Sequence, residues 1–183
     1  MTAKTDYRDY WERAVPFDRF LSREVERNHD LWEGVYRRAR TPAWARRRAA
    51  ELVGHWRLLV LAEDWCGDAV NTVPVLARLA EDVPHFELRV LGRDENPELM
   101  GRHLTNGTRS IPMAIILGER FGVAGAWGPR PAELQRFVIS EKARGVRPPR
   151  EIYAESRRWY ARDRGETTLS ELLDAVAAAT AVD

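Results

Sequence analysis

The stretch EDWCGDAVNTVP, residues 63–74, contains the only cysteine of the chain, Cys66. It follows a short apolar run and precedes a segment with helical spacing, so we expect the sulfur where a strand passes into a helix. Unpaired backbone N–H groups and the helix dipole at such a position lower the pKa of a thiol. This position favours an exposed, nucleophilic thiol over the other common role of a free cysteine, a small buried hydrophobe.

Two carboxylates flank the cysteine, Asp64 and Asp68. The negative charge of Asp68 opposes deprotonation of Cys66 about as strongly as the helix N-terminus promotes it. We therefore expect a moderately reactive thiol rather than a very acidic one. An acid in the first turn of a helix most simply serves the helix dipole. Arg93 and Arg109 are candidate partners for either carboxylate.

Other kinds of reactive site find little support in the sequence. The four histidines are scattered without the spacing of metal ligands, so neither a zinc site nor a Cys-His-Asp hydrolase is expected. There is no glycine-rich phosphate loop. One cysteine excludes an internal disulfide, so any disulfide must join Cys66 to another molecule. We therefore expect no metal and no resident cofactor.

The charge balance limits the partners. The 183 residues include 29 basic and 28 acidic side chains, for a formal net charge of +1, so we expect no nucleic-acid partner. The N-terminus has no signal-peptide core, and no apolar run approaches the roughly 20 residues of a membrane span. These features predict a cytoplasmic location and no membrane partner, and they leave the oligomeric state open.

The hydrophobic pattern predicts the elements that position the cysteine. Short helices are expected over residues 1–55. Beyond them the pattern predicts strands at 57–63, 86–94, 112–118 and 122–127, and helices at 69–83, 96–107, 132–144, 151–163 and 168–180. A β-α-β unit followed by an antiparallel hairpin indicates an α/β fold, with a central mixed sheet flanked by helices.

Five short motifs follow one another between residues 56 and 144 at a spacing typical of one fold family. They are Trp65-Cys66-Gly67, Pro74 in the following helix, Asp94 with Asn96-Pro97 after the next strand, Ile111-Pro112, and Gly128. On these motifs the chain resembles the thioredoxin-like family, in a branch with helical extensions. The resemblance implies a thioredoxin-like domain over 56–144, an N-terminal helical extension over 1–55 and a C-terminal one over 145–183, forming one compact domain overall.

The sequence departs from the family at the residues that finish a dithiol reaction. In place of the family's Cys-x-x-Cys motif the chain has Cys-Gly-Asp-Ala, so Ala69 stands where the second sulfur belongs. The family's buried acid matches Val60, and its lysine neighbour matches Val90. A dithiol reductase is therefore disfavoured, while the family motifs that position the first cysteine are present.

The resemblance also implies a binding groove beside the cysteine. It implies a cis Ile111–Pro112 peptide bond, with the Ile111 backbone placed to pair with an extended peptide or a thiol ligand such as glutathione. Cys66 is then the reacting residue, and the residues expected to contact substrate are Trp65, Gly67, Asp68, Ile111, Pro112, Trp127 and Gly128. For Trp127 a buried structural role fits the sequence equally well.

Three functions remain open at this point. Cys66 acts as a monothiol in thiol–disulfide exchange with an external resolving thiol, or the groove binds a peptide or thiol without turnover, or Cys66 senses oxidants through a sulfenic acid. A cluster shared between two chains is a more distant alternative. The expected partner is a protein disulfide or thiol, or a small thiol. The extensions are expected to complete the core, with cover for the sheet edge or a dimer surface as alternatives.

Overall fold

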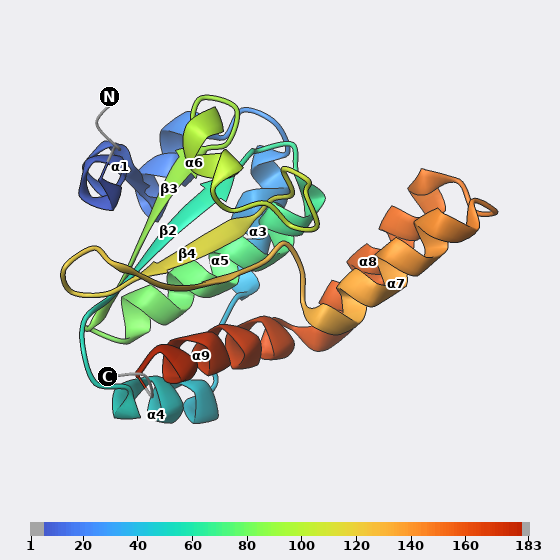
Figure 1. Ribbon diagram of the computed structural model, residues 1–183. Helices are drawn as coiled ribbons and strands as arrows, with labels where there is room; N and C mark the ends of the chain where they lie inside the picture. The colour runs from blue at the N-terminus through green and yellow to red at the C-terminus, as the bar shows by residue number, and fades with distance from the viewer. Residues whose placement is uncertain (1–5, 181–183) are drawn as a thin grey trace.

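The computed structural model describes residues 6–180, so the ends of the two predicted extensions, 1–5 and 181–183, lie outside the described residues. A five-stranded mixed sheet forms the centre, in the order β1-β3-β2-β4-β5 (Figure 1). Strands β2 and β3 run parallel, and the other neighbouring pairs run antiparallel. The predicted α/β class with a mixed sheet is confirmed. The strands are β1 Val15–Pro16, β2 Trp56–Ala62, β3 Phe86–Gly92, β4 Met113–Leu117 and β5 Val123–Trp127.

Helices precede, connect and follow these strands. Before β2 lie α1 Tyr7–Arg13, α2 Phe17–Arg19, the π-helical turn η1 Phe20–Glu24, α3 His29–Arg38 and α4 Ala43–Glu51. Between the strands lie α5 Gly67–Asp82 and α6 Pro97–Gly101, and after β5 come α7 Ala132–Arg144, α8 Pro149–Asp163 and α9 Glu166–Thr180. Within residues 6–180, none of the helices combines the length and the apolar character that crossing a membrane requires.

Strand β2 lies at the middle of the sheet because nearly all of its side chains are apolar. It pairs with β3 on one side and β4 on the other, and residues 58–62 are fully buried. Val60 lies opposite Val90 in the β2–β3 register, and both are buried. The positions that the resemblance matches to the family's acid and lysine are therefore filled by valines in the hydrophobic core.

The sheet has one strand more than the sequence predicts. Val15 and Pro16 form β1, which pairs antiparallel with Val90 and Arg89 of β3. A two-residue strand is too short to show a period-2 pattern, and its proline fits an edge position. The segment predicted as a purely helical extension thus contributes directly to the sheet.

The helix predicted over 96–107 is wrong in its second half. Helix α6 ends at Gly101, and Thr105 and Thr108 form an isolated bridge around Asn106-Gly107. Both turn residues have positive φ, +49° and +76°. Asn-Gly suits a tight turn with two positive φ angles, so the dipeptide marks a short hairpin-like turn instead of a helix end.

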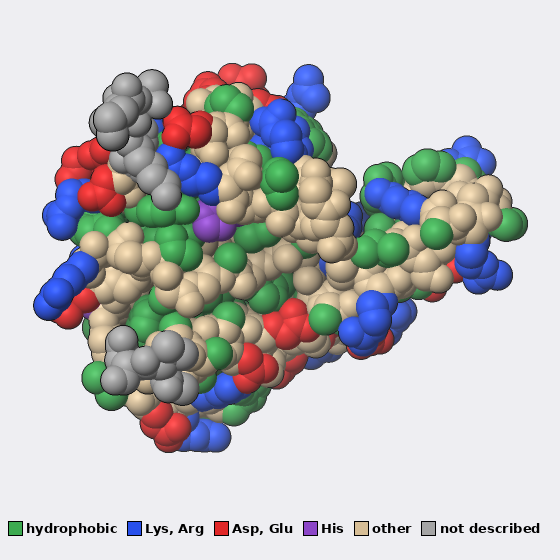
Figure 2. Space-filling view, viewed as in Figure 1, with side chains coloured by type: hydrophobic (Ala, Val, Ile, Leu, Met, Phe, Trp, Pro, Cys, Tyr) green, Lys and Arg blue, Asp and Glu red, His purple; other side chains and the backbone are tan. Residues whose placement is uncertain are grey.

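The last three helices divide into an arm and a core helix. Helices α7 and α8 pack against each other and project from the body (Figure 1), and Figure 2 shows the surface hollowed where the arm leaves the body. Helix α9 returns to the body and packs on β5 and α5. Its apolar face joins the main core, so this helix completes the core as expected. The buried residues of that face are Leu169, Leu172, Leu173 and Val176.

A glycine fixes the junction between the arm and α9. Gly165 has φ +82°, a conformation that side chains rarely adopt. A Cβ added there would lie 2.7 Å from Cγ1 of Val75 on α5. The close approach of this turn to α5 places the C-terminal end of α8 beside the helix that begins at the cysteine.

Candidate functional site

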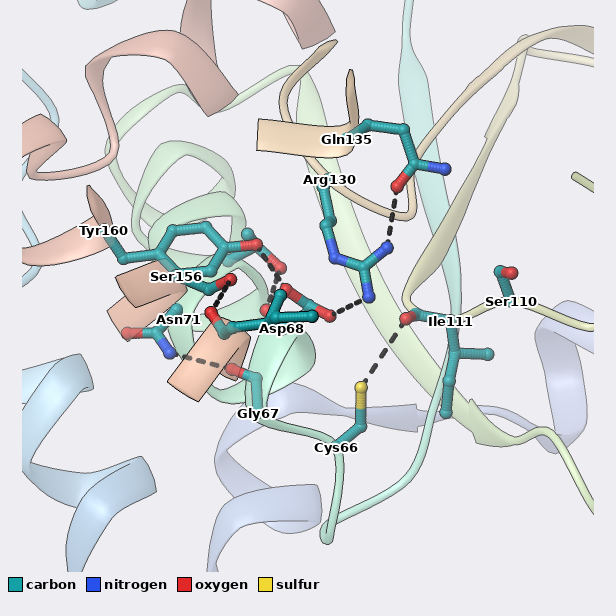
Figure 3. A network of polar contacts seen from close by, with 12 residues as sticks. Cys66, Gly67, Asp68, Asn71, Ser110, Ile111, Arg130, Gln135, Ser156 and Tyr160 are labelled. Carbon is teal, nitrogen blue, oxygen red and sulfur yellow. Dashed lines mark hydrogen bonds and ion pairs between the residues drawn. The ribbon is translucent and has the colours of Figure 1, made fainter. Parts of the chain in front are cut away.

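Cys66 lies where the sequence predicts it, between β2 and α5. It occupies the N-cap position of α5, and its carbonyl accepts the first helical hydrogen bond from the Val70 N–H at 3.0 Å. Its thiol donates to the carbonyl oxygen of Ile111, with Sγ 3.5 Å from that oxygen (Figure 3). The sulfur therefore sits between the start of the helix and the backbone before β4.

The expectation of an exposed thiol is wrong, because Cys66 is only 7% exposed. Burial raises the pKa of the Cys66 thiol, and the negative charge of Asp68 raises it further. Backbone N–H groups of Ala69 and Asp68 and the charge of Arg130 lower the pKa, but the net shift is upward. Desolvation of the thiolate therefore outweighs the effect of the helix N-terminus on this pKa.

Asp68 is held by two residues from the C-terminal third of the chain. Its Oδ2 lies 2.7 Å from Nη2 of Arg130, and its Oδ1 accepts a 2.8 Å hydrogen bond from the Tyr160 hydroxyl. Arg130 in turn donates to Gln135 at 2.7 Å, so the contacts form the network in Figure 3. The Asp68 and Arg130 side chains are only 13% and 14% exposed. Asp68 thus fastens the start of α5 to the arm as well as facing the helix dipole.

Tyr160 is the part of this network that comes from α8. Burial raises the pKa of its hydroxyl, and the negative charge of Asp68 raises it further. The hydroxyl therefore stays protonated across the physiological pH range and remains a hydrogen-bond donor.

The other flanking acid, Asp64, has a separate role. Its Oδ2 accepts hydrogen bonds from the backbone N–H groups of Glu26 and Arg27, at 3.0 and 2.7 Å. Its carbonyl accepts from Nε1 of Trp32 at 2.9 Å. Asp64 therefore ties the N-terminal segment to the end of β2, and within residues 6–180 it shares no hydrogen-bond or ion-pair partner with Asp68.

The two candidate partners, Arg93 and Arg109, pair with neither Asp64 nor Asp68. Both approach Asp94, with Arg93 Nε at 2.9 Å and Arg109 Nη2 at 3.6 Å from the same oxygen. The hydrogen bond from Arg93 lowers the pKa of the Asp94 carboxyl. The Arg93 guanidinium also stacks over the ring of Trp65, 5.1 Å from its centroid. Arg93 thus contacts the residue directly before Cys66.

A pocket of about 600 Å³ opens beside the cysteine. Of the eight residues predicted at the site, five line this pocket: Trp65, Cys66, Gly67, Asp68 and Ile111. The volume is in the range of small-molecule sites. The structure therefore brings the cysteine, the start of α5 and the backbone before β4 to one cavity.

The other three predicted residues do not line the pocket. Trp127 is buried and donates from Nε1 to Glu171 of α9 at 2.9 Å, which is the structural role left open by the sequence. A Cβ added at Gly128 would lie 2.2 Å from the Pro112 carbonyl oxygen, so only glycine permits this close approach. The Ile111–Pro112 bond is cis, as the resemblance implies, and so is the bond after Gly128.

Sequence reasoning missed the residues that the arm and the segment just before it contribute. Arg130 lines the pocket two residues beyond Gly128, and the motif WGPRP was the available signal for it. Helix α8 adds Tyr153, Ser156, Arg157 and Tyr160. No pattern connected α8 with the cysteine, since 92 residues separate Tyr160 from its partner in the first turn of α5.

The pocket wall carries more positive than negative charge. Among the described residues, Asp68 is the one carboxylate in the lining, against four arginines: Arg93, Arg109, Arg130 and Arg157. Among residues 6–180, no three His, Cys, Asp or Glu side chains gather as metal ligands do. The site therefore combines the thiol of Cys66 with a pocket wall that carries a net positive charge.

Comparisons with known proteins extend these observations. A family model described as Thioredoxin matches residues 14–144. A crystal structure of a Pseudomonas aeruginosa protein of unknown function is similar, with a TM-score of 0.75, 19% identity and coverage of 96% of this chain and 99% of that chain. An HIV epitope scaffold gives a TM-score of 0.73 at 18% identity, over 94% of this chain and 98% of that chain. At these identities the two structures show the fold alone.

The comparison with curated proteins finds no match. The family model nevertheless covers more than half of the chain, and the mixed sheet flanked by helices agrees with it. The chain belongs to the thioredoxin family.

Proposed function

We propose that this protein carries out monothiol thiol–disulfide exchange at Cys66, with an external thiol as the resolving group. The observation that supports this best is a single sulfur at the N-terminus of α5 that lines a pocket of about 600 Å³. The position of a second sulfur is taken by Ala69, which is fully buried. A dithiol cycle has no partner sulfur within the chain, whereas a monothiol cycle needs none.

The proposed reaction has two steps. The Cys66 thiol loses its proton and attacks one sulfur of a disulfide; a new S–S bond forms to Cys66, and the other half leaves as a thiolate that takes up the proton. An external thiol then attacks the substrate sulfur of this mixed disulfide and expels the Cys66 thiolate. One half of the substrate thus leaves as a thiol and the other half as a mixed disulfide with the external thiol, whose proton passes to the Cys66 thiolate.

The raised pKa of Cys66 governs the speed of both steps. At neutral pH a small share of the thiol is ionised, so the attack is slow, although each thiolate is a strong nucleophile. In the second step a thiolate of high pKa leaves slowly. The raised pKa therefore favours a long-lived mixed disulfide, and it does not favour the sensor alternative, since oxidant-sensing cysteines have low pKa values and are accessible.

A cytoplasmic location fits this cycle. The cytosol keeps thiols reduced, so it supplies both the free form of Cys66 and the external thiol of the second step. The proposed partner is a protein disulfide or a small disulfide, together with a small thiol.

A second candidate function is a module that binds a thiol or peptide without turnover. The burial and raised pKa of Cys66 favour this alternative, because neither promotes attack. In that case the Ile111 carbonyl and the pocket wall would hold the ligand, and Cys66 would be one wall residue. The substitution Cys66→Ser separates the two functions, because exchange needs the sulfur and binding by the pocket wall does not.

The test is to incubate the native chain with the small neutral disulfide bis(2-hydroxyethyl) disulfide and follow the intact mass. We expect one adduct at Cys66, released by added thiol, and no adduct in Cys66→Ser. A further readout is catalysis of exchange between this disulfide and an external thiol. A native chain that forms no adduct, when the urea-unfolded chain does, would contradict the exchange function and leave the binding module.

A further inference from the structure

The arginines of the Cys66 pocket are not equally neutralised. Arg130 is paired with Asp68 inside the pocket, and Arg93 is paired with Asp94. Arg109 is 49% exposed and reaches Asp94 only at 3.6 Å. Arg157, on the exposed side of α8, lines the pocket without a hydrogen bond or ion pair to any residue in the range 6–180. Two guanidinium groups at the pocket are therefore available to an incoming ligand.

Helix α8 also limits the shape of the ligand. Its residues Tyr153, Ser156 and Arg157 line the same pocket as Cys66 and Ile111. Residues of α8 and the backbone before β4 thus line one and the same pocket. A compact molecule fits this cavity better than an extended chain, and a volume of about 600 Å³ suits one.

From this charge and shape we infer that the substrates of the site are small disulfides and thiols that carry carboxylates. This inference rests on the proposed exchange at Cys66 and names its substrate class. Guanidinium groups bind carboxylates with paired, charge-assisted hydrogen bonds. A cationic pocket with low-dielectric walls also raises the local concentration of anions. Arg109 and Arg157 hold the carboxylates, while Cys66 receives the sulfur.

The experiment compares three disulfides of different charge. Oxidised glutathione is anionic, bis(2-hydroxyethyl) disulfide is neutral, and cystamine is cationic. The rate of adduct formation at Cys66 is measured by intact mass for each probe. It is then divided by the rate of the same probe with the urea-unfolded chain, which removes differences in intrinsic reactivity. We expect this normalised rate to be about tenfold higher for the anionic than for the cationic probe at low salt.

Variants identify the groups responsible. Arg157→Gln and Arg109→Gln should each reduce the preference for the anionic probe by about threefold or more, within the range expected for electrostatic steering. Arg158→Gln is the matched control on α8, and Arg120→Gln is the control on a loop, since both arginines are exposed and neither lines the pocket. Salt near 0.5 M should reduce the preference of the wild type for the anionic probe. The two control variants should behave like the wild type.

The outcomes separate the two proposals. Equal normalised rates for all three probes would overturn the substrate class and leave exchange at Cys66 intact. No adduct with any probe would overturn the exchange function. Binding of S-methylglutathione, which has no free thiol, then tests the anion pocket alone by calorimetry. Binding that Arg157→Gln weakens would support the pocket, and no binding at millimolar concentration would overturn it.

Discussion

The hydroxyl of Tyr160 donates a 2.8 Å hydrogen bond to Asp68, joining the last turn of α8 to the first turn of α5. The acceptor lies two residues after Cys66, so the arm is fastened beside the sulfur of Cys66. This bond and the Arg130–Asp68 ion pair make the environment of the thiol depend on residues far away in the chain.

Tyr160→Phe tests this attachment. The variant removes the hydroxyl but keeps the ring, so one hydrogen bond to a buried carboxylate is lost. We expect the free energy of unfolding to fall by about 1.5–3 kcal/mol, measured by urea denaturation. Tyr153→Phe is the control on the same helix, because Tyr153 is exposed and its hydroxyl bonds to no residue in the described range. Equal stability of the two variants would contradict the role of Tyr160.

Asp68→Asn should lower the pKa of Cys66. The substitution removes a negative charge that raises this pKa and leaves the positive charge of Arg130, which lowers it. The thiolate fraction at pH 8 therefore rises, and the rate of alkylation by iodoacetamide rises with it. Asp82→Asn, at the other end of α5 and about 20 Å away, is the control. An unchanged pH profile in Asp68→Asn would refute the electrostatic account.

Arg130→Gln leaves Asp68 largely buried without its ion-pair partner. We expect a loss of about 3 kcal/mol in the free energy of unfolding. The pKa of Cys66 should rise further, because Arg130 lowers it in the native protein. Adding Asp68→Asn should restore part of the stability, so the double variant loses less than the sum of the single ones. Arg136→Gln, an exposed position on α7, provides the control, and additive losses would argue against the pair.

Gly165→Ala tests the junction between α8 and α9. The left-handed conformation costs about 1 kcal/mol for alanine, and the new Cβ would also meet Val75 at 2.7 Å. Gly145→Ala is a matched control, since Gly145 has φ +64° and open space around an added Cβ. We expect the Gly165 variant to lose more stability than the Gly145 variant in urea denaturation. Similar losses would mean that the contact with α5 relaxes at no cost.

The raised pKa of Cys66 also predicts a dependence of stability on pH. The unfolded chain loses the thiol proton near the ordinary pKa of 9.0, while the folded chain keeps it to higher pH. The stabilisation is therefore complete below pH 9.0 and is lost as the pH rises through the folded pKa. Between pH 8 and 10.5, the wild type should lose more stability than Cys66→Ser in parallel urea titrations. Parallel curves would show that burial does not shift the titration of Cys66.

The fold was largely predictable because its signals are local and repeated. Strands β2 to β5 have apolar runs or alternation, and α5 has helical spacing over several turns. Strand β1 was not predicted, because a segment of two residues is too short to show a period-2 pattern. The Asn106-Gly107 pair was misread because the same dipeptide ends helices and forms tight turns, and only the bridge between Thr105 and Thr108 decides between them.

Only the part of the site that recognisable sequence motifs form was predictable. Trp65 to Asp68 are consecutive, and Ile111 precedes β4 in a recognisable motif, so their meeting follows from the fold. The burial of Cys66 did not follow from the sequence, because the desolvation depends on how the chain packs around the sulfur. The contacts of Asp68 with Arg130 and Tyr160 depend on how the arm docks, and no hydrophobic period specifies that docking.

The buried methyl of Ala69 has a consequence for the timing of any exchange at the neighbouring sulfur. A chain with no second thiol cannot release its own adduct, so the half-life of that adduct would vary inversely with the concentration of reductant around it. The fraction of the protein that carries an adduct would then fall as the reducing capacity of its surroundings rises.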